Sequence, residues 1–223
     1  MGGALEIHIG PANGCTIACC DGAAQIWHLP KALLSQHFEL ITKVMDARTA
    51  SKHIPEVQNG RLLLPQEHQG AFVLFVEWLY YGSYTLPDTG PASFDVEVAA
   101  YHLAEKLCSG SFINYVMAQI YERHKDDGIF RFTPVTLTPV TPTLINQVFR
   151  STSEHSLLRK FYLDYLEANF TKSNVVKGST VEWDRVMQDF PEIRMRVLEG
   201  MRADSRPAVK PLAEYMSDSP RTT

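Results

Sequence analysis

Hydrophobic residues near the start of the chain follow the two-residue spacing of a β-strand. Leu5, Ile7 and Ile9 lie at alternate positions, and a second β-prone stretch covers residues 15–20. Turn-forming residues separate the two stretches, so this region predicts a strand or a hairpin. A further short strand is predicted at residues 61–64, after a long polar loop.

Most of the remaining chain follows the three- and four-residue spacing of helices. Pro30 suits the first turn of a helix whose apolar residues extend to Met45. The most hydrophobic helix is expected at residues 72–81, where Gly82 ends it. Because Glu77 is its only charge, this helix is expected to be buried almost all round. Further helices are expected around residues 96–107, 112–120, 144–149, 158–165 and 183–190.

A change in composition divides the chain. Residues 128–142 are rich in threonine, proline and β-branched residues, and their prolines forbid a continuous helix. The capping-box pattern of Ser179 and Glu182 then marks a helix start in the second part. These features predict a first domain at residues 5–125, a linker at 126–141, a helical extension at 142–202 and a disordered tail at 203–223.

Composition and charge exclude several classes of protein. With 45% hydrophobic and 21% charged residues, the chain has the proportions of a globular protein. Its formal charge of -4 argues against a protein that grips nucleic-acid backbones. The longest hydrophobic run, residues 71–76, is far shorter than the roughly 20 residues of a membrane span. Few cysteines and the lack of a signal-peptide pattern predict a cytoplasmic or nuclear protein with reduced thiols.

Known patterns of catalytic and metal-binding residues are missing from the sequence. Cys15, Cys19 and Cys20 contain no C-x-x-C pair, and they are interpreted as small buried residues. Neither G-x-S-x-G nor H-E-x-x-H occurs, since Glu67-His68 lacks the second histidine. We therefore expect a protein that is not an enzyme and that holds neither a cofactor nor a metal.

Three blocks of sequence carry a resemblance to a known family. They are IWHLPKALLS at residues 26–35, LLLP at 62–65 followed by AFVLFVEWLYYG at 71–82, and AYHLAEKL at 100–107. In this order they resemble the BTB/POZ domain, particularly the version common in filamentous fungi. The resemblance covers about residues 5–125 and implies an α+β fold, in which a helical cluster is flanked by a short sheet.

The resemblance implies protein–protein association, either as a homodimer or as an adaptor that docks a cullin scaffold of a ubiquitin ligase. Such adaptors carry a hydrophobic-x-Glu motif in the loop after the second major helix, and Ile54-Pro55-Glu56 fits by position. Ile54 would be an apolar anchor and Glu56 the acceptor of a charge-assisted hydrogen bond. The alternative is a chance match in a polar loop, with Ile54 packed on its own domain.

Self-association has two further candidate surfaces. Leu5 and Ile7 are expected on an exposed edge strand that can pair with a second chain. The helix at 72–82 is either a central core helix or part of a dimer interface.

A second function is an indirect regulator of transcription or chromatin that recruits other proteins. It would make no DNA contact of its own, because no zinc finger, basic helix or Lys/Arg cluster is present. In either case the expected partners are proteins, including a second copy of the chain, and neither nucleic acid nor membrane. Only the helices at 142–202 are left to recognise a substrate.

Overall fold

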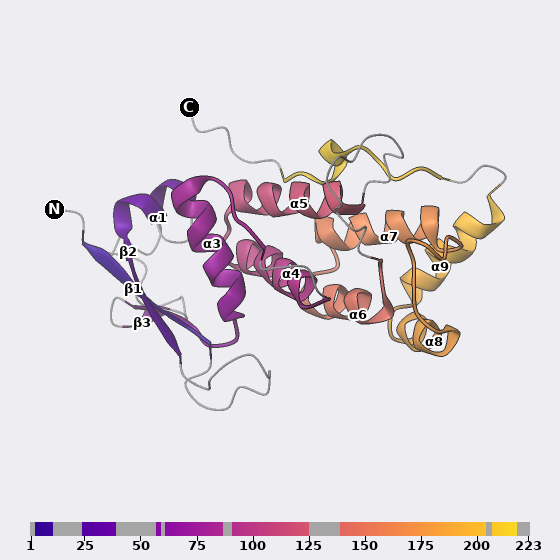
Figure 1. Ribbon diagram of the computed structural model, residues 1–223, viewed down its shortest axis with the longest axis horizontal. Coiled ribbons are helices and arrows are strands. Elements are labelled where there is room, and N and C mark those ends of the chain that lie inside the picture. Colours follow the sequence, from indigo (N-terminus) through magenta and orange to yellow (C-terminus); the bar gives the residue numbers. More distant parts are fainter. Residues whose placement is uncertain are drawn as a thin grey trace. The chain divides into compact units, whose positions relative to one another are not determined.

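The computed structural model of the chain describes residues 3–10, 24–38, 57–58, 61–86, 91–124, 139–203 and 207–217. It divides into two compact units. The first contains Met1–Ile113 together with Arg221–Thr223, and the second contains Asn114–Pro220. Figure 1 shows the elements of each. The class is α+β, as predicted, and the sheet belongs to the first unit. The boundary falls inside helix α5 (Gly110–His124), upstream of the linker predicted at 126–141.

The first unit contains a four-stranded sheet with the order β2-β1-β4-β3. Strand β1 (Ala4–Ile9) pairs antiparallel with β2 (Gln25–Pro30) and parallel with β4 (Arg61–Leu64). The short β3 (Val57–Gln58) pairs antiparallel with β4. The strand predicted at 61–64 is therefore confirmed, whereas the stretch at 15–20 lies outside the described residues.

The prediction that Leu5 and Ile7 lie on an exposed edge is wrong. Strand β1 has a hydrogen-bonded neighbour on both sides, so its backbone has no free edge. Both side chains are buried in the core, and Ile7 lies opposite Trp27 on one neighbour and Leu62 on the other. The alternating pattern identified the strand, but its place in the sheet depends on residues distant in the sequence.

Helices of the first unit follow their predicted positions, with changes at the ends. Helix α1 (Lys31–His37) ends before the predicted residue 45, because Phe38 has extended backbone angles. Helix α3 (Gln69–Tyr81) ends at Gly82, whose φ of 71° is left-handed and favours glycine. Helix α4 (Pro91–Lys106) follows it. Helix α3 packs on α4, and its Phe72 ring lies 5.6 Å from Trp27 of β2, so α3 lies between the sheet and α4 (Figure 1).

An aromatic cluster forms the centre of this core. The Phe75 ring lies 5.0 Å from Phe38 and 5.2 Å from Phe112, at the start of α5. The Trp78 ring lies 4.8 Å from Phe112. Edge-on and tilted contacts of this kind stabilise a core beyond the area that they bury. The inner face of α3 thus contributes Phe75 and Trp78 to the centre of this core.

Helix α7 (Leu157–Asn169) is the central element of the second unit. It packs against α6 (Pro142–Ser151), α9 (Pro191–Arg202) and the short 3₁₀ helix η1 (Leu212–Tyr215). Helix α8 (Thr180–Asp189) begins with the predicted capping box: the Ser179 hydroxyl accepts from the Glu182 amide, and the Glu182 carboxylate accepts from the Ser179 amide.

Residues 207–217 are ordered, although a disordered tail was predicted from residue 203. Tyr215 is fully buried, and Asn114 of α5 hydrogen-bonds both the amide and the carbonyl of Ser217. The segment is polar and contains proline, so its composition suggests disorder, but its backbone and one tyrosine find partners on α5 and α7. Residues 204–206 and 218–223 lie outside the described part of the chain.

Candidate functional site

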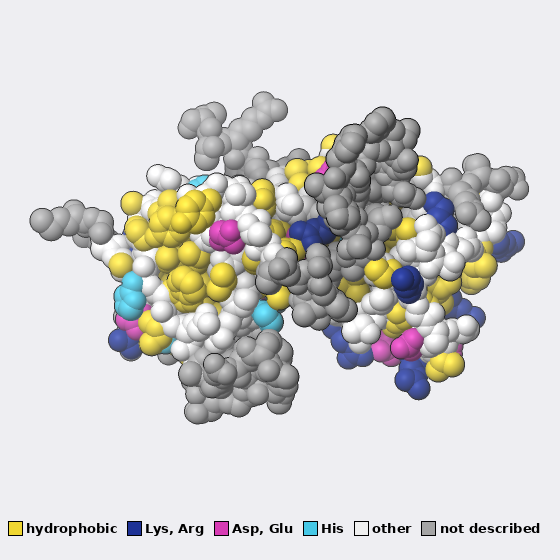
Figure 2. Space-filling view, in the orientation of Figure 1, with side chains coloured by type: hydrophobic (Ala, Val, Ile, Leu, Met, Phe, Trp, Pro, Cys, Tyr) yellow, Lys and Arg dark blue, Asp and Glu magenta, His cyan; other side chains and the backbone are white. Residues whose placement is uncertain are grey.

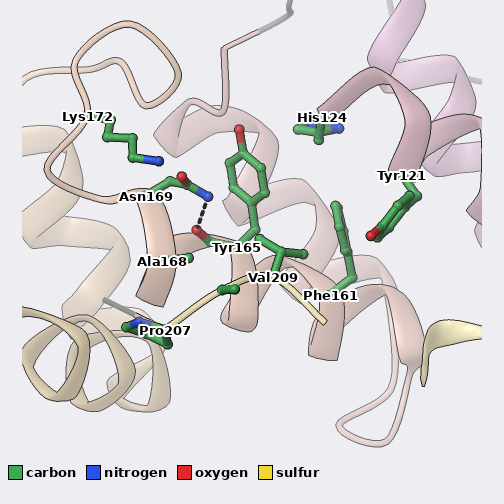
Figure 3. Close-up of a pocket in the computed structure, with 10 residues that line it drawn as sticks. Tyr121, His124, Phe161, Tyr165, Ala168, Asn169, Lys172, Pro207 and Val209 are labelled. Atoms are coloured by element: carbon green, nitrogen blue, oxygen red, sulfur yellow. Dashed lines mark hydrogen bonds between the residues drawn. The ribbon is translucent and has the colours of Figure 1, made fainter. Parts of the chain in front are cut away.

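A pocket of about 450 Å³ lies in the second unit, among α5, α7 and the segment that contains residues 207–209 (Figure 3). Its walls are largely aromatic: Tyr121 comes from α5, and Phe161 and Tyr165 come from α7. The volume is within the range of small-molecule sites. Sequence reasoning did not single out this pocket, because its residues come from three separate segments.

His124 forms an uncharged wall of the pocket. Its Nδ1 lies 2.8 Å from the Ile120 carbonyl, and its ring makes edge-on contacts with Phe161, Tyr162 and Tyr165. Burial lowers the pKa of His124 from 6.5 to about 4, because desolvation penalises the charged form. At neutral pH His124 is therefore an aromatic neighbour rather than a cation.

The polar side of the pocket is formed by Asn169 and Lys172, which lie near each other in Figure 3. The Asn169 amide donates to the Tyr165 carbonyl at 3.1 Å. Its side-chain oxygen is an acceptor, and the Lys172 ammonium is a donor with a positive charge. Aromatic walls beside one cation suit a flat apolar group that carries an anionic substituent.

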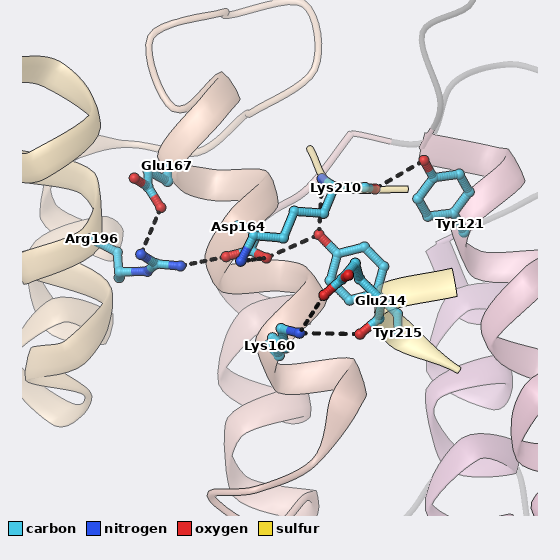
Figure 4. Close-up of polar contacts among 8 residues, drawn as sticks. All are labelled: Tyr121, Lys160, Asp164, Glu167, Arg196, Lys210, Glu214 and Tyr215. Atoms are coloured by element: carbon cyan, nitrogen blue, oxygen red, sulfur yellow. Dashed lines mark hydrogen bonds and ion pairs between the residues drawn. The ribbon is translucent and has the colours of Figure 1, made fainter. Parts of the chain in front are cut away.

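A buried carboxylate next to this pocket holds the C-terminal segment in place (Figure 4). Asp164 of α7 is buried, and it forms ion pairs with Arg196 of α9 and, at 3.4 Å, with the Lys210 ammonium. The Tyr215 hydroxyl donates to Asp164 at 3.0 Å and accepts from the Lys210 amide. Burial and the Asp164 charge raise the pKa of Tyr215, so the hydroxyl stays protonated and keeps this bond.

Around the carboxylate, further bonds fix the same segment. The Tyr121 hydroxyl donates to the Lys210 carbonyl at 3.1 Å, and the Lys160 ammonium lies 3.1 Å from the Glu214 carbonyl. Arg196 also pairs with Glu167 at 3.0 Å. Each buried charge in this cluster has an opposite charge beside it, as burial requires. The cluster joins α7, α9 and the C-terminal segment. This structural role accounts for the charged residues gathered here without a substrate.

The outer face of α3 is an exposed hydrophobic surface of the first unit, in addition to the exposed Ile26 of β2. It carries Val73, Tyr80 and Tyr81, of which Tyr80 is 53% and Tyr81 79% exposed. Residues at spacings of seven and eight share one side of a helix, and the half-buried Glu77 lies between them. Figure 2 shows hydrophobic side chains gathered over this part of the surface. The expectation that α3 is buried almost all round therefore holds only for its inner face.

A buried ion-paired group connects two helices of the first unit. Glu67, in the turn before α3, lies 3.0 Å from the Lys106 ammonium and 3.5 Å from Nδ1 of His102, both on α4. Burial alone would raise the pKa of Glu67, but hydrogen bonds from His102 and Lys106 outweigh it and lower this pKa. The bond to Glu67 raises the pKa of His102. No nucleophile is paired with these groups in the contacts above, and their geometry ties the turn to α4.

The remaining predicted site residues, Ile54 and Glu56, lie outside the described residues. Leu5 and Ile7 are in the core, as stated above. The sequence predicts the helix at 72–82 to be either a core helix or part of a dimer interface. Tyr80 and Tyr81 are the residues that could have indicated an exposed face. Two adjacent tyrosines at a helix end are not needed to fill a core that already holds Phe75 and Trp78.

Within the described part of the chain, no three His, Cys, Asp or Glu side chains come together to hold a metal ion. Among the same residues, no helix has both the length and the hydrophobicity to cross a bilayer. Neither a protein-family model nor a curated protein matches this chain.

Proposed function

We propose that this chain is a protein-association module of the BTB/POZ type, which self-associates or bridges other proteins in the cytoplasm or nucleus. The observation that carries the proposal is the outer face of α3, where two adjacent tyrosines and a valine two turns away are exposed on one side of the helix. Tyrosine is enriched in protein interfaces, because its ring is apolar and its hydroxyl remains able to hydrogen-bond. The α+β fold and the position of α3 between sheet and α4 support the resemblance.

Self-association is tested by sedimentation velocity of the chain and of a Tyr80→Ser/Tyr81→Ser variant. We expect the unmodified chain to dimerise and the variant to have a dimer dissociation constant at least about tenfold higher, since interface tyrosines are frequent hot spots. Val181→Ser, which removes a 62% exposed residue of the second unit, is the control and should leave the dimer unchanged. A double variant that dimerises as well as the unmodified chain would remove α3 from the proposal.

Docking to a cullin is the adaptor form of the same proposal. Glu56→Lys is expected to abolish binding to the N-terminal domain of a cullin scaffold, because it reverses the charge of the motif's hydrogen-bond acceptor. Because the sequence predicts that Glu56 lies in a polar loop, the free energy of unfolding should change by no more than about 0.5 kcal/mol. Calorimetric titration and urea unfolding measure the two effects. If the unmodified chain and the Glu56→Lys variant bind the cullin equally, Ile54-Pro55-Glu56 is a chance match.

A further inference from the structure

A second pocket, of about 410 Å³, lies on the side of the second unit formed by α8 and α9. Its lining includes Trp183 and Met187 of α8, and Val197, Leu198 and Met201 of α9. We call it the α8–α9 groove. Trp183 is fixed in place, because its indole donates to the Lys177 carbonyl at 3.2 Å and its ring stacks edge-on with Phe170. The groove therefore has a rigid aromatic wall beside adaptable methionines.

Helix α9 has two hydrophobic sides. Ile193, Val197 and Gly200 are buried on the inner side, whereas Met195, Leu198 and Met201 are exposed on the outer side. The exposed fractions are 57% for Met195, 45% for Leu198 and 58% for Met201. A helix at the surface of a single folded unit normally presents a polar outer side. The outer side of α9 is thus a hydrophobic strip that leads into the groove.

The charges on this outer side are positive. At 100° per residue, Arg194 and Arg202 lie among the exposed methionines, whereas Glu192 and Glu199 lie together on the flank. In the part of the chain that the structure describes, neither Arg194 nor Arg202 has an ion-pair partner. Asp184, on the opposite wall, is engaged by the Gln188 amide at 2.7 Å. Figure 2 shows basic side chains, with some acidic ones among them, over the part of the surface that α8 and α9 form.

We propose that the α8–α9 groove binds an acidic amphipathic helix of another protein. Hydrophobic anchors at spacings of three and four would enter beside Trp183, Met187 and Leu198. Carboxylates flanking those anchors would pair with Arg194 and Arg202. Docking of a helix into a methionine-lined groove is a recurrent mode of recognition. This surface is separate from the outer face of α3, and the inference does not depend on association through α3.

The test is a titration followed by fluorescence anisotropy. The probe is a fluorescein-labelled synthetic helix with leucines at spacings of three and four and glutamates elsewhere, and its counterpart carries lysines in place of the glutamates. We expect the glutamate peptide to bind at least about tenfold more tightly than the lysine peptide, with an affinity that falls as salt rises.

Three variants locate the binding site. Leu198→Asp places a carboxylate in the groove, and Arg194→Glu/Arg202→Glu reverses the two positive charges on the outer side of α9. Both variants should bind the glutamate peptide at least about tenfold more weakly than the unmodified chain does. Val181→Asp changes an exposed hydrophobic residue of α8 that does not line the groove, and it should leave the affinity unchanged. Circular dichroism checks the folding of each, and the arginine variant remains informative if Leu198→Asp unfolds.

Several results would overturn the inference. One is equal binding of the two peptides, and another is unchanged binding by both groove variants. A third is that no peptide binds while Leu198→Asp abolishes a dimer, because the occupant of the groove is then a second copy of the chain. The Tyr80→Ser/Tyr81→Ser variant should bind the peptide normally, so failure of the α3 proposal can be told apart from failure here.

Discussion

His124 shows how a single buried residue makes stability depend on pH. Above pH 6.5 it is neutral in both the folded and the unfolded chain. Between pH 6.5 and about 4, the unfolded chain binds a proton that the folded chain does not, so the free energy of unfolding falls as the pH falls. The fall is at most about 1.4 kcal/mol per pH unit, or about 3 kcal/mol across the window.

We expect His124→Gln to remove this part of the pH dependence. Glutamine does not titrate and can still donate to the Ile120 carbonyl. Urea unfolding at pH 7.5 and pH 5.0 measures the effect, and the difference between the two pH values should be smaller in the variant by about 2 kcal/mol. The same difference in both proteins would mean that His124 is protonated readily in the folded chain.

Single residues also mark what could be predicted. The start of α8 at Ser179 and Glu182 and the end of α3 at Gly82 were predictable. A helix start or end depends on only a few neighbouring residues. The burial of Tyr215 was not predictable, because it depends on Asp164, 51 residues earlier in the chain. No local pattern around residue 215 carries that information.

At the level of elements, the contact between α7 and α9 depends on one glycine. A Cβ on Gly200 would overlap with the Glu167 carbonyl oxygen, which belongs to the backbone of α7 and has little room to move. Such a close approach sets both the distance between the helices and the rotation of α9 about its axis. The outward direction of Met195 and Leu198 follows from that rotation.

We expect Gly200→Ala to destabilise the second unit by about 1–3 kcal/mol, even though alanine favours helices, because the added methyl group overlaps with α7. Urea unfolding monitored by circular dichroism measures the loss. Gly3→Ala is the control, since a Cβ there meets nothing within 4 Å, and it should change stability by less than about 0.5 kcal/mol. A stabilised Gly200→Ala variant would show that the helices do not approach so closely.

Elements differ in how far their patterns reveal their surroundings. The spacing of apolar residues placed α3 and β1 correctly along the chain, because both periodicities are local. Whether a strand lies at the centre or the edge of a sheet depends on its partners, and β1 acquires two of them from residues 25–30 and 61–64. Hydrophobic residues on both sides of α3 likewise could not show which side faces solvent.

For the whole molecule, the two units respond to acid in opposite directions. In the first unit, the raised pKa of His102 contributes stability that is complete below pH 6.5 and is lost as the pH rises through the raised value. The lowered pKa of Glu67 contributes stability above pH 4.5 that is lost as the pH falls through the lowered value. This pair is therefore most stabilising between pH 4.5 and 6.5, where His124 weakens the second unit.

Hydrogen exchange followed by mass spectrometry should separate the two units. When the pH falls from 7.5 to 5.5, and after correction for the intrinsic effect of pH, protection is expected to fall about fivefold to tenfold in α7 and to rise or stay constant in α3. Peptides from His124→Gln provide the control, because α7 should then keep its protection. Equal changes in α3 and α7 would contradict the opposite responses.

The bond between Asp164 and Tyr215 has a consequence for synthesis. A chain emerges from its N-terminus, and early regions fold first. The sheet pairings and α3 ring contacts described above involve no residue later than Phe112, so they can form while later residues are still being added. The Asp164 carboxylate stays solvated until its partners Arg196, Lys210 and Tyr215 have been synthesised. Tyr215 is the last of them, 51 residues after Asp164 in the chain. The second unit can therefore close around its carboxylate only after translation has passed residue 215, and a ribosome that stalls earlier leaves α7 uncovered.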